Sequence, residues 1–412
     1  MTHSAQGRTG QGHTEQQLSR WLAPGAALLA LALMVLTAWL NVFPIGKEPY
    51  FIDLESYRDT LDGVVAGDLM YDWLGYPPVT LIILSPLRGL PQLAGDRLWT
   101  GGTILMALAL AAALAKLTTP PAADAEAARR GFLIRFGVAG SLLLISFPMT
   151  SQLATGQITL IVITLAFLDA SGVLSRRFQG TLVGLAASLK LLPLMFFPYY
   201  LVTRQWRQLI LAATAFGLSV AVGFALFPVD SAYFWAHTNS SERLGPARAD
   251  NVSLFGLLNR WIQDPAVATW VWLPLAGAIG VAAYLRAWQH FRRGEQVQAA
   301  LVVGCTSTVV SPIAWPHYQV WLVLAAIWLI LWGNRRARLW GMLIYLVYSL
   351  LFAYVLFGMT GQSMAMRLGW ELMVLVPVLI AVLGLPHGQT DPTPGDATRR
   401  GSRGPGSLLS SD

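Results

Sequence analysis

The sequence predicts an all-α integral membrane protein, and three observations support this fold class. Hydrophobic residues make up 55% of the 412 residues, charged residues only 12%, and the mean hydropathy is +0.54. Soluble domains carry about 25% charged residues, so the composition is typical of membrane proteins. Apolar runs recur along the chain, and Arg and Lys residues form short clusters between them, as the positive-inside rule expects.

The apolar runs predict roughly 10–12 transmembrane helices, because a spanning helix needs about 20 mostly apolar residues. We expect them to form one polytopic domain over residues 21–385. Several runs contain Pro or Gly, which membrane helices tolerate where protein or a cavity satisfies the backbone. The candidate spans are residues 21–43, 77–93, 98–117, 131–147, 152–168, 181–201, 209–227, 267–285, 297–310, 316–331, 339–357 and 368–385.

Both ends of the chain are polar. Residues 1–20 predict a disordered cytoplasmic N-terminus, and the first apolar run is long enough to be an uncleaved anchor. Residues 386–412 are rich in Gly, Pro and Ser and are basic, so we expect a disordered cytoplasmic tail.

Basic clusters orient the second half of the chain. Residues 203–208, 286–295 and 334–338 are expected on the cytoplasmic side, and loops 230–251, 311–316 and 359–367 on the outer side. In the first half, strict alternation puts the clusters at 129–135 and 175–179 outside, against the rule. If residues 77–93 and 181–201 are re-entrant instead, both clusters lie inside. Either topology places Asp53 outside, after the first helix.

The composition also argues against several functional classes. The net charge of +7 is spread over short clusters, with no continuous basic face for nucleic acid. The single cysteine, Cys305, lies in an apolar run, which excludes a disulfide framework. No spacing of His, Asp and Glu suggests a metal cage, and no Gly-rich phosphate loop with a lysine is present.

One stretch concentrates acidic side chains beside the first span. Residues 50–81 contain six of the 21 acidic residues. Within 54–69 the apolar residues follow helical spacing, which predicts an amphipathic helix lying at the outer interface. Asp53 precedes this helix, either as a capping residue or as a functional carboxylate. The other acids are expected to form its solvated face.

Polar residues at membrane depth mark two further stretches. Gln157 in "TSQLATGQITL" begins a membrane helix and either faces a cavity or joins two helices. Lys190 in "SLKLLPLMFFPYY" lies inside an apolar run, where a lysine either snorkels to the interface or meets an anion.

Two outer loops contain the remaining candidates. The loop at 234–261 carries Arg243, Asn251 and Arg260, and its cations either bind phosphate or line the membrane rim. In "SPIAWPHYQVW", Trp315 is expected in an interfacial aromatic belt. His317 either belongs to this belt or hydrogen-bonds a lipid phosphate or shuttles a proton.

Six segments between residues 51 and 322 carry a family resemblance: "FIDLESYRDTL", "LMYDWLGYPPVTLIILSPLRGLP", "ATGQITLIVITL", "SLKLLP", "RLGPARADNVSLFGLLNR" and "VVSPIAWPHYQVWL". In content and order they resemble glycosyltransferase family 87, whose members use polyprenyl-phosphate-linked sugars and share the C-type membrane glycosyltransferase fold. The resemblance extends to actinobacterial α-1,2-mannosyltransferases of this family.

The resemblance implies that Asp53 is the general base and that His317 contacts the donor phosphate or assists at the reaction centre. Lys190 is expected on the donor side, and Arg243 and Arg260 as further cations for the phosphate. The substrates implied are a polyprenyl-phosphate sugar donor and a glycolipid or lipoglycan acceptor in the membrane. The sugar is expected to pass to the acceptor by inverting displacement, without cofactor or metal. Residues expected to bind substrate are Glu55, Tyr57, Tyr76, Gln157, Asn251 and Trp315.

Other functions remain open at this point. A related activity is arabinofuranosyl transfer from polyprenyl-phosphoarabinose. A transporter or flippase for lipid-linked sugars would favour charges in mid-membrane and paired broken helices. Most spans here lack such charges, with Lys190 the main exception, and the candidates gather on one face. A non-catalytic scaffold would tolerate loss of Asp53.

Overall fold

The computed structural model describes residues 7–43, 51–69, 75–122, 124–237, 247–248, 250–356 and 364–386, and every regular element in these ranges is a helix. The all-α prediction is therefore confirmed. The elements are α1 (Gly7–Val42), α2 (Ile52–Ala66), α3 (Thr80–Leu84), η2 (Ser85–Leu87), α4 (Gln92–Thr118), α5 (Ala125–Ile145), α6 (Phe147–Thr155), α7 (Thr159–Ala170), α8 (Thr181–Leu189), η3 (Leu192–Met195), α9 (Phe196–Val202), α10 (Trp206–Leu226), α11 (Pro228–His237), α12 (Leu254–Ile262), α13 (Pro265–Arg292), α14 (Gln296–Val310), η5 (Pro316–Gln319), α15 (Val320–Trp332), α16 (Arg335–Leu356) and α17 (Met364–Leu383).

The helices are those of an integral membrane protein. Among the described residues, four helices are long and apolar enough to cross a bilayer: Arg20–Val42, α4, α10 and α13. Helices α5 and α6 form one further apolar pair, bent by 64° at residue 146. Shorter apolar helices, α7 and α14 among them, complete the bundle.

The first helix begins earlier than the sequence predicts. Residues 7–20 form the first turns of α1, so the expected disorder of residues 1–20 is wrong for this part. Good helix formers at 15–18 precede Trp21 without an intervening proline, and they extend the helix toward the N-terminus. The tail at 387–412 lies outside the described residues.

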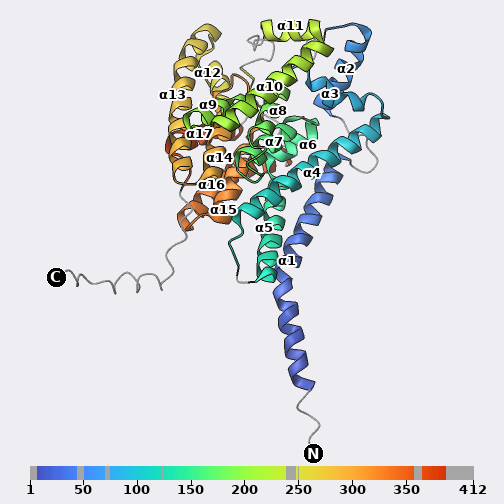
Figure 1. Ribbon diagram of the computed structural model, residues 1–412, viewed down its shortest axis with the longest axis vertical. Helices are drawn as coiled ribbons and strands as arrows, with labels where there is room; N and C mark the ends of the chain where they lie inside the picture. The colour runs from blue at the N-terminus through green and yellow to red at the C-terminus, as the bar shows by residue number, and fades with distance from the viewer. Residues whose placement is uncertain are drawn as a thin grey trace, which may run out of the picture.

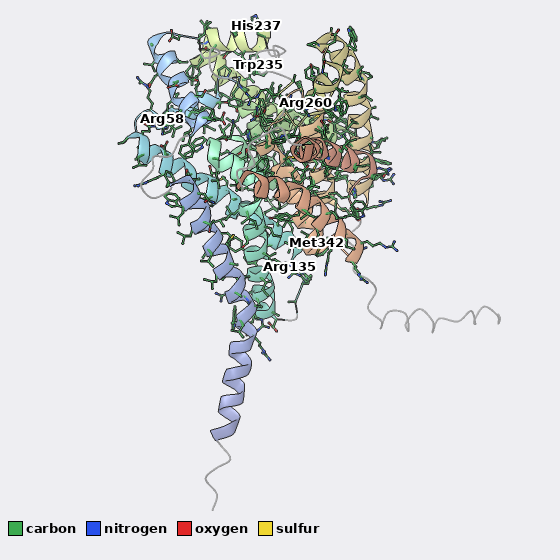
Figure 2. All side chains as sticks on the ribbon, turned by 180° about the vertical axis from the view of Figure 1, so that it is seen from behind. Arg58, Arg135, Trp235, His237, Arg260 and Met342 are labelled. Carbon is green, nitrogen blue, oxygen red and sulfur yellow. The ribbon has the colours of Figure 1, made fainter. Side chains whose placement is uncertain are left out.

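Helices α14 and α15 form the centre of the bundle. Residues 297–309 and 320–329 are buried without exception. Helices α1, α4 and α5 pack along one flank, and α12, α13, α16 and α17 lie on the other (Figure 1). Helices α2 and α11 lie at one end of the molecule, whereas α1 extends beyond the bundle at the other (Figure 1). The labelled side chains agree, since Arg58 and His237 lie toward the first end and Arg135 toward the second (Figure 2).

The segment of residues 77–93 starts and finishes at the same end of the helix bundle. Arg58 of α2 forms an ion pair with Asp96 in the first turns of α4, with 2.7 Å between Nη2 and Oδ1. The same nitrogen donates to the Gln92 carbonyl at 3.2 Å. Because α2 and the start of α4 are joined, α3 and η2 form a re-entrant segment and not a full span.

Residues 181–201 are also re-entrant. Asp169 of α7 accepts the backbone N–H groups of Gly180 and Val183 at 2.6 and 2.9 Å, which fixes the start of α8. The chain extends at Lys190 and returns through η3 and α9. Arg207 then donates to the carbonyls at 176 and 177. The two basic loops therefore lie together, and the re-entrant topology is the one that the structure adopts.

Candidate active site

Helix α2 places Asp53 in its first turn, where the carboxylate does not cap the helix. The N-cap position belongs to Phe51, which makes no side-chain capping bond. The capping interpretation of Asp53 is therefore wrong. Residues four apart share a helix face, so Asp53 and Tyr57 point to the same side, and Tyr57 is buried. A carboxylate in a first turn also interacts favourably with the helix dipole.

This face of α2 lies directly on the break between α6 and α7. The break begins at Gly156, whose φ of +71° suits glycine. A Cβ added to Gly156 would lie 2.7 Å from Cβ of Leu54. The Gln152 side chain donates to the Gln157 carbonyl and so satisfies part of the interrupted backbone. Only glycine permits α2 to approach this closely.

Gln157 is the centre of a buried hydrogen-bond network. Its Oε1 accepts from the hydroxyls of Tyr57, Tyr76 and Thr159 at 3.1, 3.0 and 3.3 Å. The backbone N–H of Ile158 donates to the Tyr57 hydroxyl at 3.3 Å. Three hydroxyl donors fix the carboxamide oxygen, so the amide group is left to donate. It lies near enough to the Asp53 carboxyl to lower the pKa of that group.

Lys190 enters the same network from the bend after α8. Its Nζ donates to the Thr159 hydroxyl at 2.7 Å and to the Tyr76 hydroxyl at 3.4 Å. The ammonium also lies 3.9 Å from the ring centroid of Tyr318 and 4.9 Å from that of Tyr76. Lys190 is only 5% exposed, so it does not snorkel to the interface. It is a buried cation whose opposite charge is Asp53.

The environment of Asp53 suits a general base. The side chain is half-buried, and desolvation by burial raises the pKa of the Asp53 carboxyl above its ordinary value. Hydrogen bonds from Gln157 and Thr155 and the positive charge of Lys190 oppose this rise in pKa. The result is a carboxylate that is a stronger base than a solvated one and is still held by donors.

His317 lies behind Tyr318 at the start of η5. The imidazole is 4% exposed, and its ring centroid is 4.9 Å from that of Tyr318. Its Nε2 is buried and has no hydrogen-bond partner among the described residues. A buried imidazole with an unused nitrogen does not belong to a surface aromatic belt, so that interpretation of His317 is wrong.

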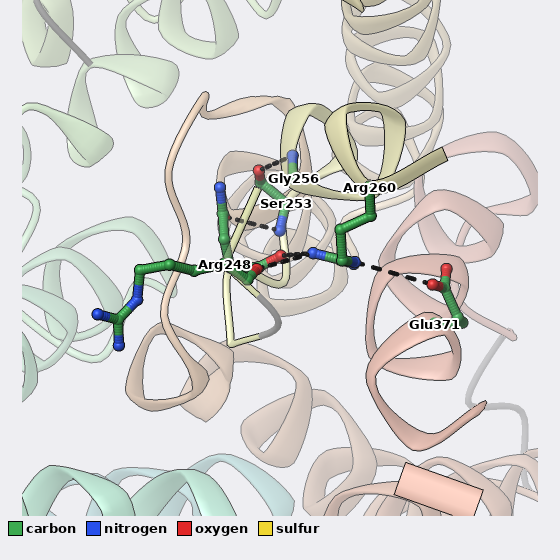
Figure 3. Close-up of polar contacts among 6 residues, drawn as sticks. Arg248, Ser253, Gly256, Arg260 and Glu371 are labelled. Atoms are coloured by element: carbon green, nitrogen blue, oxygen red, sulfur yellow. Dashed lines mark hydrogen bonds and ion pairs between the residues drawn. The ribbon is translucent and has the colours of Figure 1, made fainter. Parts of the chain in front are cut away.

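The predicted residues of the loop at 234–261 have structural contacts. The Asn251 side chain accepts from Ala314 N at 3.0 Å and donates to the Pro312 carbonyl at 3.2 Å. Arg260 donates to the carbonyls of Arg248 and Asn251 and lies 3.9 Å from Glu371 (Figure 3). Asn251 thus holds the segment that leads to His317, and Arg260 holds the loop that carries Asn251. The phosphate-binding role of Arg260 stays a prediction.

Two other predicted residues, Trp315 and Glu55, make no side-chain hydrogen bond or ion pair to the network among the described residues. The guanidinium carbon of Arg248 lies over the Trp315 ring, 5.2 Å from the ring centroid. Glu55 is two residues from Asp53, about 200° around α2, and so projects from a different face. Arg243 lies outside the described residues.

Two members of the network are absent from the predicted site. Thr159 links Lys190 to Gln157, and Tyr318 covers the lysine. Thr159 follows Gln157 by two residues in "GQITL", and Tyr318 follows His317 directly. Their only signal in the sequence is therefore that they lie close to predicted site residues.

Comparison with known proteins gives a consistent family. Residues 73–312 match glycosyltransferase family 87. The polyprenol-phosphate-mannose-dependent α-(1-2)-phosphatidylinositol mannoside mannosyltransferase of Mycobacterium tuberculosis is 31% identical, over 77% of this chain and 76% of its own. The enzyme of the same name from Mycolicibacterium smegmatis is 31% identical over 77% and 79%. A pentamannoside mannosyltransferase from that organism is 28% identical over 78% and 80%. No solved structure matches the chain significantly.

Proposed function

The chain belongs to glycosyltransferase family 87, and we propose that it transfers a mannosyl residue from a polyprenyl-phosphate carrier to a phosphatidylinositol mannoside. The names of the similar mycobacterial enzymes support the donor and the acceptor class. The observation that carries the proposal is the convergence of Asp53, Lys190 and Gln157 in one network, with His317 behind it.

In the proposed reaction, an acceptor hydroxyl oxygen attacks the anomeric carbon of the donor mannose. Asp53 takes the hydroxyl proton as the new C–O bond forms. The bond between the anomeric carbon and the phosphate oxygen breaks, and polyprenyl phosphate leaves with the electron pair. In-line attack on a β-linked donor gives an α-linked product, so one base suffices and no covalent sugar–enzyme intermediate is needed.

Cations and hydrogen-bond donors are expected to stabilise the leaving phosphate. The Lys190 ammonium has three N–H groups, two of which donate to Thr159 and Tyr76, so one remains for a phosphate oxygen. The unused Nε2 of His317 is the second candidate. Because both groups are buried, their interactions with phosphate are stronger than in water. We propose no metal and no cofactor for this step.

We place the reaction at the extracytoplasmic face. Helix α2 is amphipathic, with Leu54, Tyr57 and Leu61 buried and Asp59 and Asp62 exposed, as expected for a helix at the membrane surface. A lipid carrier is the sensible sugar donor on a side of the membrane without nucleotide sugars. Arg135, in one of the basic clusters, lies toward the opposite end (Figure 2), which fits a cytoplasmic position for that end.

The proposal is tested with the purified chain in vesicles that contain phosphatidylinositol mannoside. Tritiated polyprenyl-phosphomannose should label the acceptor, and the new linkage should be α by NMR. Polyprenyl-phosphoarabinose, tested in parallel, should give no product. Transfer of arabinose alone would overturn the mannosyl assignment. Movement of the donor across the membrane without transfer would overturn the enzymatic one.

A further inference from the structure

An apolar cavity of about 270 Å³ lies between the re-entrant segment α3–η2 and helix α4. Leu98 on its wall is 63% exposed and Gly102 is exposed, so the cavity opens on an exposed face of the apolar helix α4. Protein interiors are normally packed without such space, and apolar cavities suit apolar ligands. Its walls consist of Ile83, Pro86, Leu87, Leu90, Leu98, Trp99, Gly102, Thr103, Met106 and Ile161.

The inner wall of the cavity is continuous with the candidate active site. The Trp99 ring lies 6.1 Å from the ring of Tyr57, centroid to centroid. Ile161 belongs to α7 and, with Trp99, packs against the buried cluster that contains Tyr57 and Ile158. The buried indole N–H of Trp99 has no acceptor among the described residues. An apolar ligand in the cavity would therefore reach the Tyr57 side of the network.

One wall also begins beside Lys190. The Thr80 hydroxyl, at the start of α3, donates to the carbonyl of Leu189 at 3.1 Å. From Thr80 the chain runs through α3 to Leu87 in the cavity wall, a distance of about 10 Å at 1.5 Å per residue. A lipid whose phosphate lies at Lys190 can therefore extend its chain along this segment into the cavity.

We propose that this cavity holds the first isoprene units of the donor's polyprenyl chain, a proposal that rests on the proposed function. The acceptor's acyl chains are the alternative occupant. The position of α3 favours the donor, because its wall leads to Lys190, the cation expected at the donor phosphate. The remaining isoprene units would lie in the bilayer.

Gly102 offers a substitution that fills the cavity without disturbing the fold. A Cβ at Gly102 meets no atom within 4 Å, and the residue lines the cavity. Gly101 is equally open to a Cβ but is not part of the lining, so it provides a matched control. Leucine is a better helix former than glycine, so neither substitution weakens α4.

The test compares Gly102→Leu with Gly101→Leu, using a long-chain polyprenyl-phosphomannose and a short donor, methyl phosphomannose, that has no isoprene units. Gly102→Leu should raise KM for the long-chain donor about tenfold, since each displaced methylene costs about fourfold in affinity. KM for the short donor, kcat and KM for the acceptor should not change, and Gly101→Leu should behave as wild type. An unchanged KM for the long-chain donor, or a raised KM for the acceptor instead, would overturn the proposal.

A direct binding experiment separates this proposal from the proposed function. A prenyl phosphate with a photoreactive group near its phosphate end should label α3 or α4 in the wild type and in Gly101→Leu, but not in Gly102→Leu. If the wild type transfers no mannose yet shows this labelling, the proposed function fails and the cavity assignment stands. Labelling confined to other helices would overturn the cavity assignment.

Discussion

Replacing Gln157 with Glu distinguishes the role of its carboxamide oxygen, an acceptor, from that of its amide group, a donor. The carboxylate of Gln157→Glu can still accept hydrogen bonds from Tyr57, Tyr76 and Thr159, so the network and the fold should persist. The amide donor to Asp53 is lost. Only the bond that stabilises the Asp53 carboxylate is therefore removed.

The size of the effect follows from this hydrogen bond. A hydrogen bond to a charged group contributes about 1.5–3 kcal/mol. Its loss raises the pKa of Asp53, since about 1.36 kcal/mol corresponds to a tenfold change in a protonation equilibrium. Repulsion by the new carboxylate acts in the same direction. A general base works only when it is deprotonated. As the pH is lowered, the variant should therefore lose activity at a higher pH than the wild type does.

The assay is the pH profile of kcat/KM for mannosyl transfer. The acid limb of Gln157→Glu should move upward by at least about one pH unit, with activity recovering as pH rises. Asp59→Asn, which removes an exposed acid from the same helix, should leave the limb in place. An acid limb at the wild-type pH, with only the height of the profile reduced, would refute the contact between Gln157 and the base.

Three further predictions concern the architecture and the chemistry. Asp96→Ala leaves the largely buried Arg58 without its partner and should lower stability by about 3–5 kcal/mol, measured by thermal inactivation. Asp62→Ala, at an exposed ion pair, should cost at most about 1 kcal/mol, and equal losses would contradict this ranking. Gly156→Ala forces α2 away from the α6–α7 break at Leu54 and should abolish transfer while membrane insertion continues; wild-type turnover would show that the close approach is unnecessary. Transfer should persist in EDTA, and a loss that a divalent cation reverses would contradict the metal-free proposal.

Periodicity and composition predict the fold class and the position of α2. Sequence alone left the topology of the first half open, because a broken apolar run has the same composition whether it crosses the membrane or turns back. The contacts that decide between the two, such as Arg58 with Asp96 and Arg207 with the carbonyls at 176 and 177, join residues distant in sequence.

The candidate site is predictable where a polar residue stands out against apolar neighbours. Gln157 and Lys190 meet this condition, and the structure joins them through Thr159. Thr159 itself gives no such signal, because a threonine is common in membrane helices. Asn251 and Arg260 look like ligand-binding residues in sequence, but the fold of their loop turns them toward backbone carbonyls.

The most direct test is mannosyl transfer by Asp53→Asn, measured beside Asp59→Asn at equal amounts of membrane-inserted protein. Asparagine keeps the shape of the side chain and removes its ability to take a proton. The account predicts that Asp53→Asn inserts normally and transfers no mannose above background, while Asp59→Asn retains wild-type turnover. Substantial turnover by Asp53→Asn would contradict the assignment of Asp53 as the catalytic base.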